Sequence, residues 1–501
     1  MRSLQCFLPL LRGRTIFIFP AAGGEYKTIF TSCLPRPWGR ISVEVNEKMN
    51  KNDIITLEIT GLTSEGSGIG RSAEGMAVFV PKTAVGDVIE ARILKVLSSY
   101  AYGKVERIIT PSPDRIENDC PVFGKCGGCV YRHITYTAEL SAKERIVRDA
   151  FERIGGLAPE FLPICGSEKT ERYRNKLQMP FAKDENGVII SGFFSERSHR
   201  VIAVDDCKLQ PLIFSEIVGF IKQECKKLKI SIYNEQAHEG VLRHIYLRKG
   251  EKSGEICAVI VAKRKVPEFK KLAADIVRRF PDITGVVLNI NPDKTNVILG
   301  EREITLCGKA DISDEMCGVG FEISPMSFYQ VNTPQAEKLY AEAENFAEPS
   351  GKTLLDLYCG VGTIGLSMAG KAAKVIGAEI VSEAVENARR NAEMNGFDNT
   401  EFICADAAEA AARLAESGLA PDVILLDPPR KGCDEETLAA CVKMSPQRIV
   451  MISCNPATAA RDCKYFAENG YTVEKVRAFD LFPRTRHVEC VVLMTHAGNA
   501  K

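Results

Sequence analysis

Short runs in which apolar and polar residues alternate fill the chain between residues 51 and 109. DIITLEITGL (53–62), MAVFVPKTAVGDVIEARILKV (76–96) and AYGKVERIIT (101–110) follow the two-residue period of β-strands. A glycine-rich segment, SEGSGIGRSAEG, separates the first two. Short strands without a long helix predict a small closed β-barrel of the OB type over residues 49–110. Barrels of this type often bind nucleic acid, and a purely structural barrel is the alternative.

Strand patterns also dominate from about residue 173 to 328, as in KLQMPFA, RHIYLRK and EICAVIVAK. Two helical patterns, IFSEIVGFIKQECKKL and FKKLAADIVRRF, lie between them, which predicts an α+β central domain. An amphipathic helix, TAELSAKERIVRDAFERIGG, precedes this region and ends at two glycines.

From about residue 335 strand-like and helical segments alternate regularly. TLLDLYCG, KVIGAEI, TEFICAD, DVILLDPP and RIVMISC are strand-like, and HVECVVLMTH closes the series. Such alternation predicts a parallel, doubly wound α/β sheet. The first 48 residues follow none of these patterns. We expect them to be unstructured, or the true start to be Met49, because Arg12, Arg14 and Pro20 interrupt the apolar stretches that a targeting peptide would need.

Composition narrows the class of protein. The 501 residues have a net charge of zero, so any nucleic-acid surface has to be a local cluster of Lys and Arg. No run of about 18 apolar residues occurs, and we expect no membrane span. The 18 cysteines are spread along a long chain, which favours a reducing cytoplasm over a disulfide scaffold.

The glycine-rich segment DLYCGVGTIG (356–365) follows an apolar strand and enters a helix. Its glycines allow close approach of a ligand to the backbone, and the helix N-terminus offers free N–H groups. Glu379 ends the next strand, where it can bind ribose hydroxyls, and Asp406 ends the third, where an adenine contact is expected. The acid Asp356 before the glycines favours S-adenosylmethionine over NAD.

Two further segments lie at the carboxyl edge of the predicted sheet, where ligands of such folds bind. LLDPPRKG (425–432) carries Asp427, which can orient a donor or a base, and MISCNP (451–456) carries Cys454. A thiolate that adds to C6 of uracil makes C5 nucleophilic, so C5 can take a methyl group from a sulfonium. A base must then remove the C5 proton. Glu489 is the expected base, and His487 is the alternative.

Five motifs in this order resemble the RNA uracil-5 methyltransferase family, which forms 5-methyluridine in tRNA or 23S rRNA. They are FYQVN (328–332), DLYCGVGT, DPPRKG, SCNP and HVECV, and the resemblance covers residues 52–494. By similarity, Cys454 is the nucleophile and Glu489 the base. The expected contacts to S-adenosylmethionine are Gln330, Tyr358, Thr363, Glu379, Asp406 and Asp427.

The resemblance also implies a domain plan. The barrel is similar to the TRAM domain, an RNA-binding module of many members. Residues 116–133 and 171–327 would form a central RNA-binding domain with an iron–sulfur site, and residues 134–170 and 328–497 a Rossmann-like methyltransferase domain.

A cysteine cluster, CPVFGKCGGC, contains Cys120, Cys126 and Cys129, and Cys207 in VDDCKLQ is a fourth candidate. Four thiolates suit either zinc or an iron–sulfur cluster. The spacing resembles the members of the family that hold a 4Fe-4S cluster, which the tRNA branch generally lacks. We therefore expect a 4Fe-4S cluster and 23S rRNA as the substrate. A cluster in which Cys binds all four irons has no open iron, so a structural or RNA-docking role is favoured over radical chemistry.

Basic residues interleaved with aromatic ones predict an RNA surface in the central domain. The candidates are Arg172, Arg174, Lys176, Arg243 and His244. A target base within folded RNA has to be flipped out to reach Cys454. The alternatives are a tRNA uridine methyltransferase, a base N-methyltransferase that uses the DPPR loop, and a non-catalytic RNA-binding iron–sulfur protein. No obligate protein partner is inferred.

Overall fold

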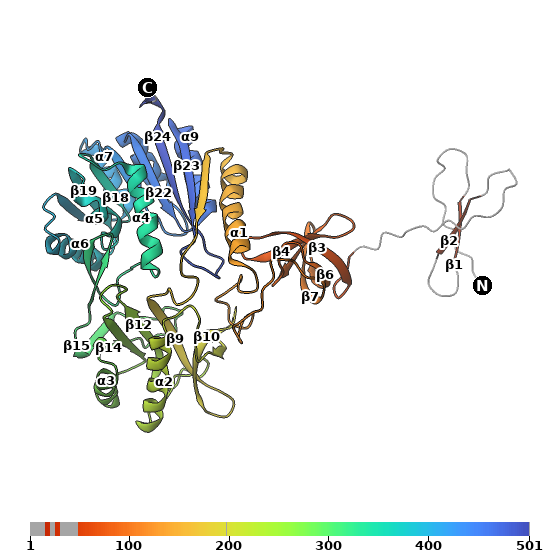
Figure 1. Ribbon diagram of the computed structural model, residues 1–501, viewed down its shortest axis with the longest axis horizontal. Helices are drawn as coiled ribbons and strands as arrows, with labels where there is room; N and C mark the ends of the chain where they lie inside the picture. Colours follow the sequence, from red (N-terminus) through yellow and green to blue (C-terminus); the bar gives the residue numbers. More distant parts are fainter. Residues whose placement is uncertain (1–15, 21–25, 31–48, 197, 500–501) are drawn as a thin grey trace. The chain divides into compact units, whose positions relative to one another are not determined.

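The computed structural model describes residues 16–20, 26–30, 49–196 and 198–499 of the chain, and for 16–20 and 26–30 only the backbone (Figure 1). It divides into two units, residues 1–49 and 50–501, which we treat separately. In the first unit β1 (Ile16–Pro20) and β2 (Tyr26–Phe30) pair antiparallel. The rest of the segment that we expected to be unstructured lies outside the described residues. Among the helices of the described part, none is long and apolar enough to cross a membrane.

The predicted barrel is confirmed as a closed five-stranded sheet in the order β3-β4-β5-β7-β6. Alternate residues such as Leu57, Ile59, Val78 and Val80 are buried inside it, as the two-residue period requires. Its strands are β3 (Ile54–Leu62), β4 (Ser67–Arg71), β5 (Ala77–Pro81), β6 (Val88–Val96) and β7 (Tyr100–Thr110).

The central region contains a seven-stranded sheet in the order β11-β10-β9-β12-β13-β14-β15, packed against two helices. Strands β12 and β13 at its centre are buried on both faces. The elements are β9 (Lys176–Lys183), β10 (Ile189–Phe194), β11 (Val201–Ala203), α2 (Leu212–Lys227), β12 (Leu242–Lys249), β13 (Ile256–Ala262), α3 (Glu268–Arg279), β14 (Ile283–Ile290) and β15 (Arg302–Gly308).

An eight-stranded sheet in the order β20-β19-β18-β21-β22-β24-β23-β8 forms the C-terminal α/β part. Its first five strands are parallel, as predicted, whereas β24 runs antiparallel between β22 and β23. The strands are β18 (Thr353–Leu357), β19 (Lys374–Glu379), β20 (Thr400–Cys404), β21 (Val423–Leu426), β22 (Arg448–Ser453), β23 (Tyr471–Phe479), β24 (Glu489–His496) and β8 (Glu160–Cys165). Since β8 pairs with β23, a strand that precedes the central sheet in sequence contributes to this sheet.

Helices cover both faces of this sheet, and their side chains form two separate buried clusters. In Figure 1, α1 and α4 lie beside the strands β22 to β24. The helices are α1 (Tyr136–Asp149), α4 (Thr333–Ala347), α5 (Thr363–Ala369), α6 (Ser382–Met394), α7 (Ala407–Glu416), α8 (Glu435–Met444) and α9 (Pro456–Glu468), and the π-helix η1 (Ala150–Gly155) and the 3-10 helix η2 (Ala497–Asn499) complete the set.

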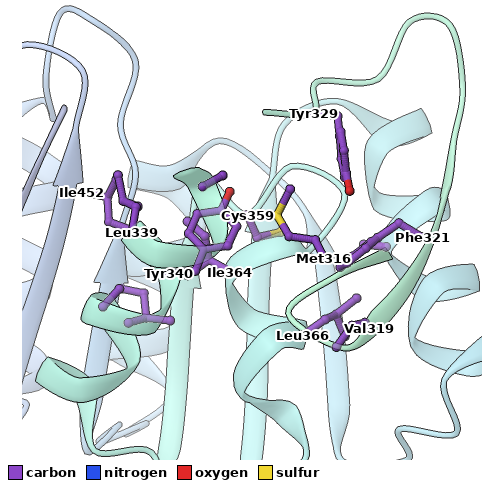
Figure 2. Packing of buried hydrophobic residues seen from close by; sticks show 14 of the residues in the cluster. Met316, Val319, Phe321, Tyr329, Leu339, Tyr340, Cys359, Ile364, Leu366 and Ile452 are labelled. Atoms are coloured by element: carbon purple, nitrogen blue, oxygen red, sulfur yellow. The ribbon is translucent and has the colours of Figure 1, made fainter. Parts of the chain in front are cut away.

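A hairpin joins the central sheet to the α/β part. Its strands are β16 (Ile312–Met316) and β17 (Val319–Ile323). Figure 2 shows Met316, Val319 and Phe321 of this hairpin packed in one cluster with residues of the α/β part such as Cys359 and Leu366. The hairpin thus gives the central sheet and the α/β part a common core.

Candidate active site

The glycine-rich loop after β18 takes a shape that few side chains permit. Tyr358, Gly360 and Gly362 have φ angles of 68°, 57° and 85°, in the left-handed region that glycine adopts freely. At Gly365 a Cβ atom would lie 2.9 Å from Oδ2 of Asp356, and the Gly365 N–H donates to that oxygen at 2.9 Å. The backbone therefore favours glycine at positions 360, 362 and 365, and a buried carboxyl fixes the start of the loop.

Asp356 is almost fully buried, and burial raises its pKa to about 8. Its second oxygen, Oδ1, has no hydrogen-bond partner within the described chain. A buried carboxyl with a raised pKa keeps its proton and carries no charge at pH 7. Asp356 therefore holds the loop through its hydrogen bond with Gly365 and adds no negative charge beside a ligand.

Glu379 lies at the end of β19, beside the same loop. Its two carboxylate oxygens accept hydrogen bonds from the N–H groups of Gly360 at 3.1 Å and Val381 at 2.9 Å. Each carboxylate oxygen can accept a second bond, so capacity for ribose hydroxyls remains. Ile380 and Val381 are 63% and 52% exposed, which leaves an apolar surface beside this carboxylate.

Asp406 is exposed and caps the N-terminus of α7, where its Oδ1 accepts from the Ala408 N–H at 3.0 Å. Tyr358 is partly buried and packs on the α/β core. The structure thus places Tyr358, Glu379 and Asp406 on the ends of neighbouring parallel strands β18, β19 and β20, the edge at which α/β folds bind ligands.

A buried tyrosine, Tyr340 on α4, joins three of the expected site residues. Its hydroxyl is 3.2 Å from Oγ1 of Thr363 and also bonds the side chain of Gln330. Burial, with the nearby Asp427 carboxyl, raises the pKa of Tyr340, so its phenol stays protonated. Figure 2 shows its ring beside Ile364 and Cys359. Sequence reasoning missed this residue, since one tyrosine in an amphipathic helix carries no local signal.

The two residues predicted to do the chemistry meet at adjacent strand ends. Strand β22 ends at Ser453 opposite Cys490 on β24, so Cys454 and Glu489 occupy the next pair of positions outward. Burial, together with the nearby carboxyls of Glu489 and Asp427, raises the pKa of the Cys454 thiol to about 11. Burial likewise raises the pKa of Glu489 to about 8. A thiol and a carboxyl that both hold their protons therefore face one site.

Arg430 is the cation of this site, and it lowers the pKa of both Cys454 and Glu489. Its backbone oxygen accepts from Nδ2 of Asn455 at 2.9 Å, which ties the DPPR loop to the SCNP loop. Its Nη2 lies 3.3 Å from a ring nitrogen of His487. The sequence motif contained Arg430, but its electrostatic role became visible only in the structure.

The pKa of His487, the alternative base, lies below its ordinary value. Burial lowers its pKa to about 4, and the cations Arg430 and Arg486 contribute. The ring is therefore neutral at pH 7 and is a much weaker base than Glu489. Phe482 packs edge-on against it at 5.8 Å between ring centroids.

The four predicted cysteine ligands come together although they lie up to 87 residues apart. Cys120, Cys126, Cys129 and Cys207 line one cavity of about 250 Å³. Burial, together with the neighbouring thiols of Cys207 and Cys126, raises the pKa of Cys129 to about 12. Within the described ranges, no three His, Cys, Asp or Glu residues are arranged to hold a single metal ion.

Some of the basic residues predicted to bind RNA have partners inside the protein. Arg172 forms a two-pronged ion pair with Asp206, with both distances 2.6 Å. Arg243 is 2% exposed and donates to the backbone oxygens of Asn291 and Asp293. These two guanidinium groups are therefore already used in holding the fold together.

The other three basic candidates differ in their access to solvent. His244 is buried, which lowers its pKa to about 4, and its ring nitrogens have no partner in the part of the chain that is described. Arg174 and Lys176 are only partly buried and line the cysteine cavity. Burial and two neighbouring cations lower the pKa of Lys176 to about 8.

Comparison with known proteins places this site in a family. The family model of tRNA (uracil-5-)-methyltransferases matches residues 135–497, and the TRAM domain model matches residues 48–105. An uncharacterized RNA methyltransferase of Halalkalibacterium halodurans is 41% identical over 449 residues, 89% of this chain and 98% of the relative. A second, of Clostridium acetobutylicum, is 43% identical over 451 residues, 89% and 98% of the two chains.

Among solved structures, the tRNA (uracil-54, C5)-methyltransferase of Pyrococcus abyssi in complex with S-adenosyl-L-homocysteine is similar, with a TM-score of 0.71. It is 29% identical, and the match covers 88% of this chain and 99% of that one. A family model that spans most of the chain, together with the arrangement of Cys454 and Glu489, leads to one conclusion: the chain is a member of the RNA uracil-5 methyltransferase family and an RNA methyltransferase with a TRAM domain.

Proposed function

We propose that the protein transfers a methyl group from S-adenosylmethionine to C5 of a uridine in RNA through a covalent adduct between Cys454 and C6. The observation that supports this proposal most strongly is that Cys454, directly after β22, and Glu489, at the start of β24, occupy facing positions at one edge of the sheet that also carries the glycine-rich loop after β18. A base N-methyltransferase would need neither a thiol nor a second carboxyl at this point.

The methyl donor fits the edge formed by β18, β19 and β20. Bound there, S-adenosylmethionine would supply an electrophilic methyl group on a sulfonium. Glu379 would accept from the ribose hydroxyls, with Ile380 and Val381 against the adenine, and Asp406 would bind the adenine amino group. The relative from Pyrococcus abyssi holds the demethylated product of this donor, which supports the assignment.

The remaining expected contacts would bind the amino-acid end of the donor. Gln330, Thr363 and Asp427 surround the Tyr340 hydroxyl, and Tyr358 supports the loop from the other side. The buried tyrosine fixes these side chains before the ligand arrives, which reduces the free energy spent on ordering them.

The chemistry follows from the two strand ends. The reacting form has lost the protons of Cys454 and Glu489 to solvent. The Cys454 thiolate adds to C6, and the electrons of the C5–C6 double bond move through C4 to O4 as an enolate. C5 then attacks the methyl group, the bond between the methyl carbon and the sulfonium breaks, and the demethylated donor leaves as a neutral thioether. The Glu489 carboxylate takes the C5 proton, the double bond re-forms, and the bond between sulfur and C6 breaks to release the thiolate. Arg430 stabilises both anions, the thiolate and the carboxylate.

Replacing Arg430 by glutamine is expected to lower kcat at pH 7 by about thirtyfold, because a charge-assisted hydrogen bond contributes about 2 kcal/mol. Without this cation the pKa of Cys454 and that of Glu489 both rise, so the rising limb of the kcat profile should move to higher pH. Methylation rates between pH 6 and 10 test this. Lys431→Gln removes a neighbouring exposed cation and should leave the profile in place. Identical profiles for the two variants would contradict the role of Arg430.

We propose 23S rRNA as the substrate, since the cysteine site resembles the rRNA branch. A tRNA uridine is the second candidate, because the relative from Pyrococcus abyssi is named for tRNA. Nucleoside mass spectrometry of rRNA and tRNA treated with the protein and the methyl donor distinguishes the two. We expect 5-methyluridine at a mapped site in one of them. Methyl groups found only on exocyclic nitrogen would refute the proposed chemistry.

We further propose that Cys120, Cys126, Cys129 and Cys207 hold a 4Fe-4S cluster. The four thiols share one cavity of about 250 Å³, and four thiolates suit an iron–sulfur cluster or a zinc ion. Anaerobically purified protein should show about four iron atoms per chain and brown visible absorbance. Cys207→Ser should lose both, whereas Cys225→Ser, at a buried cysteine on α2, should keep them. Stoichiometric zinc without iron would refute the cluster.

For RNA contact we retain Arg174 and Lys176, which are partly exposed, together with the barrel β3 to β7. Phe328 adds an aromatic ring that is 65% exposed, two residues before Gln330. A ring in this position can stack on a base that has left the RNA helix. We place this activity in the cytoplasm, where RNA substrates and free thiols coexist.

A further inference from the structure

The loop that joins β23 to β24, residues 480–488, contains no helix or strand of its own and ends directly at Glu489. Its conformation depends on contacts from elsewhere. Lys143 on α1 donates from Nζ to Oδ1 of Asp480 at 2.7 Å and to the Phe482 backbone oxygen at 3.2 Å. The Lys143 and Asp480 side chains are completely buried, so this pair tolerates little movement.

The same loop is bound by one wall of the cysteine cavity. The backbone oxygen of Arg484 accepts from the N–H groups of Val130 at 2.9 Å and Tyr131 at 3.2 Å. Val130 directly follows Cys129, one of the residues that line the cavity. Arg484 itself has a φ of 70°, a conformation that non-glycine residues adopt only when neighbouring contacts hold them.

The other wall reaches the loop through a side chain. The Tyr173 hydroxyl, on a residue that is 3% exposed, donates to the backbone oxygen of Pro483 at 3.0 Å. The N–H groups on either side of Tyr173 donate to the oxygens of Lys208 and Leu209 at 2.8 and 3.1 Å. These two residues directly follow Cys207, so this wall reaches the loop through two successive hydrogen bonds, and the wall at Cys129 reaches it through one.

We propose that the cysteine site is a positioning device for the catalytic base, with Tyr173 as a positioning residue. When its walls are held together, the carbonyls of Pro483 and Arg484 are fixed, and the loop presents Glu489 to Cys454. A methyl transfer needs no electrons from a cluster, and this arrangement gives the site a function without redox chemistry. The proposal rests on the proposed role of Glu489.

Tyr173→Phe tests the proposal because it removes only the hydroxyl that binds the loop. We expect kcat to fall about fivefold, the factor that one ordinary hydrogen bond supplies, with KM for RNA and methyl donor changed less than about twofold. Amide hydrogen exchange over residues 481–489 should become faster by a similar factor. The exchange measurement does not require activity or a loaded cysteine site.

Tyr471→Phe is a matched control. Tyr471 is also buried, and its hydroxyl also donates to a proline carbonyl, that of Pro446, at 3.1 Å. This variant should lose comparable stability without a change in kcat or in exchange of the loop. Equal kcat and equal loop exchange in the two variants of an active protein would overturn the proposal. The proposed function fails on a different result, a wild-type chain that forms no 5-methyluridine.

Discussion

Cys454→Ala should abolish uridine methylation, with kcat reduced by about 10⁴-fold or more, because the variant has no group to add to C6 and activate C5. The edge proposed for the methyl donor is formed by β18, β19 and β20, so donor binding should persist. Single-turnover transfer from labelled donor measures the first effect, and calorimetry with the donor measures the second. Loss of both together would indicate misfolding and not loss of the nucleophile.

RNA that carries 5-fluorouridine at the target makes this prediction sharper. Fluorine at C5 cannot leave as a proton does, so the wild-type protein should remain covalently attached to the methylated RNA. Cys454→Ala should form no such complex. Cys307→Ala is the control, since Cys307 is a partly exposed thiol on β15 of the central sheet, and it should be trapped like the wild type. Trapping that persists in Cys454→Ala, or that fails in the wild type, would contradict the adduct.

The place of Cys454 at the ligand-binding edge could be predicted from sequence because this residue follows the end of β22, whereas Glu489 begins β24 and reaches the same edge only because β24 runs antiparallel. A residue that ends a buried strand of an α/β sheet lies at the ligand-binding edge whatever the rest of the fold does. The direction of β24 could not be predicted in this way. All but its last two residues are buried, and a continuous apolar run looks the same in a parallel strand and an antiparallel one.

The basic residues of the central sheet show a second limit. LRHIYLRK reads as a half-exposed strand with charged residues facing solvent, yet seven of the eight residues of β12 are buried. Sequence periodicity reports polarity but not which elements cover each face. Arg243 and Arg248 are buried because carbonyl oxygens far along the chain, such as that of Ser324, accept their hydrogen bonds. Tyr340 could not be identified from the sequence for the same reason, because its hydrogen-bond partners come from separate segments of the chain.

Glu489→Gln should separate methyl transfer from product release. The carboxylate of Glu489 raises the pKa of Cys454, so its removal should favour the thiolate and leave addition to C6 intact. Removal of the C5 proton should slow by about 10²- to 10⁴-fold, the range for loss of a general base. Methylated RNA should therefore accumulate on Cys454 as a complex that survives denaturation, even with natural uridine.

The pH dependence gives an independent reading of the same carboxyl. Burial raises the Glu489 pKa to about 8, so the wild-type release rate should increase as the pH rises through that value and more of the carboxylate forms. Glu489→Gln should lose this step. Glu303→Gln is the control, because burial also raises the Glu303 pKa in the central sheet, and it should retain the wild-type profile. A Glu489→Gln variant that turns over at the wild-type rate would assign proton removal to another group, and Asp427, whose pKa burial raises to about 7, would be the next carboxyl to replace.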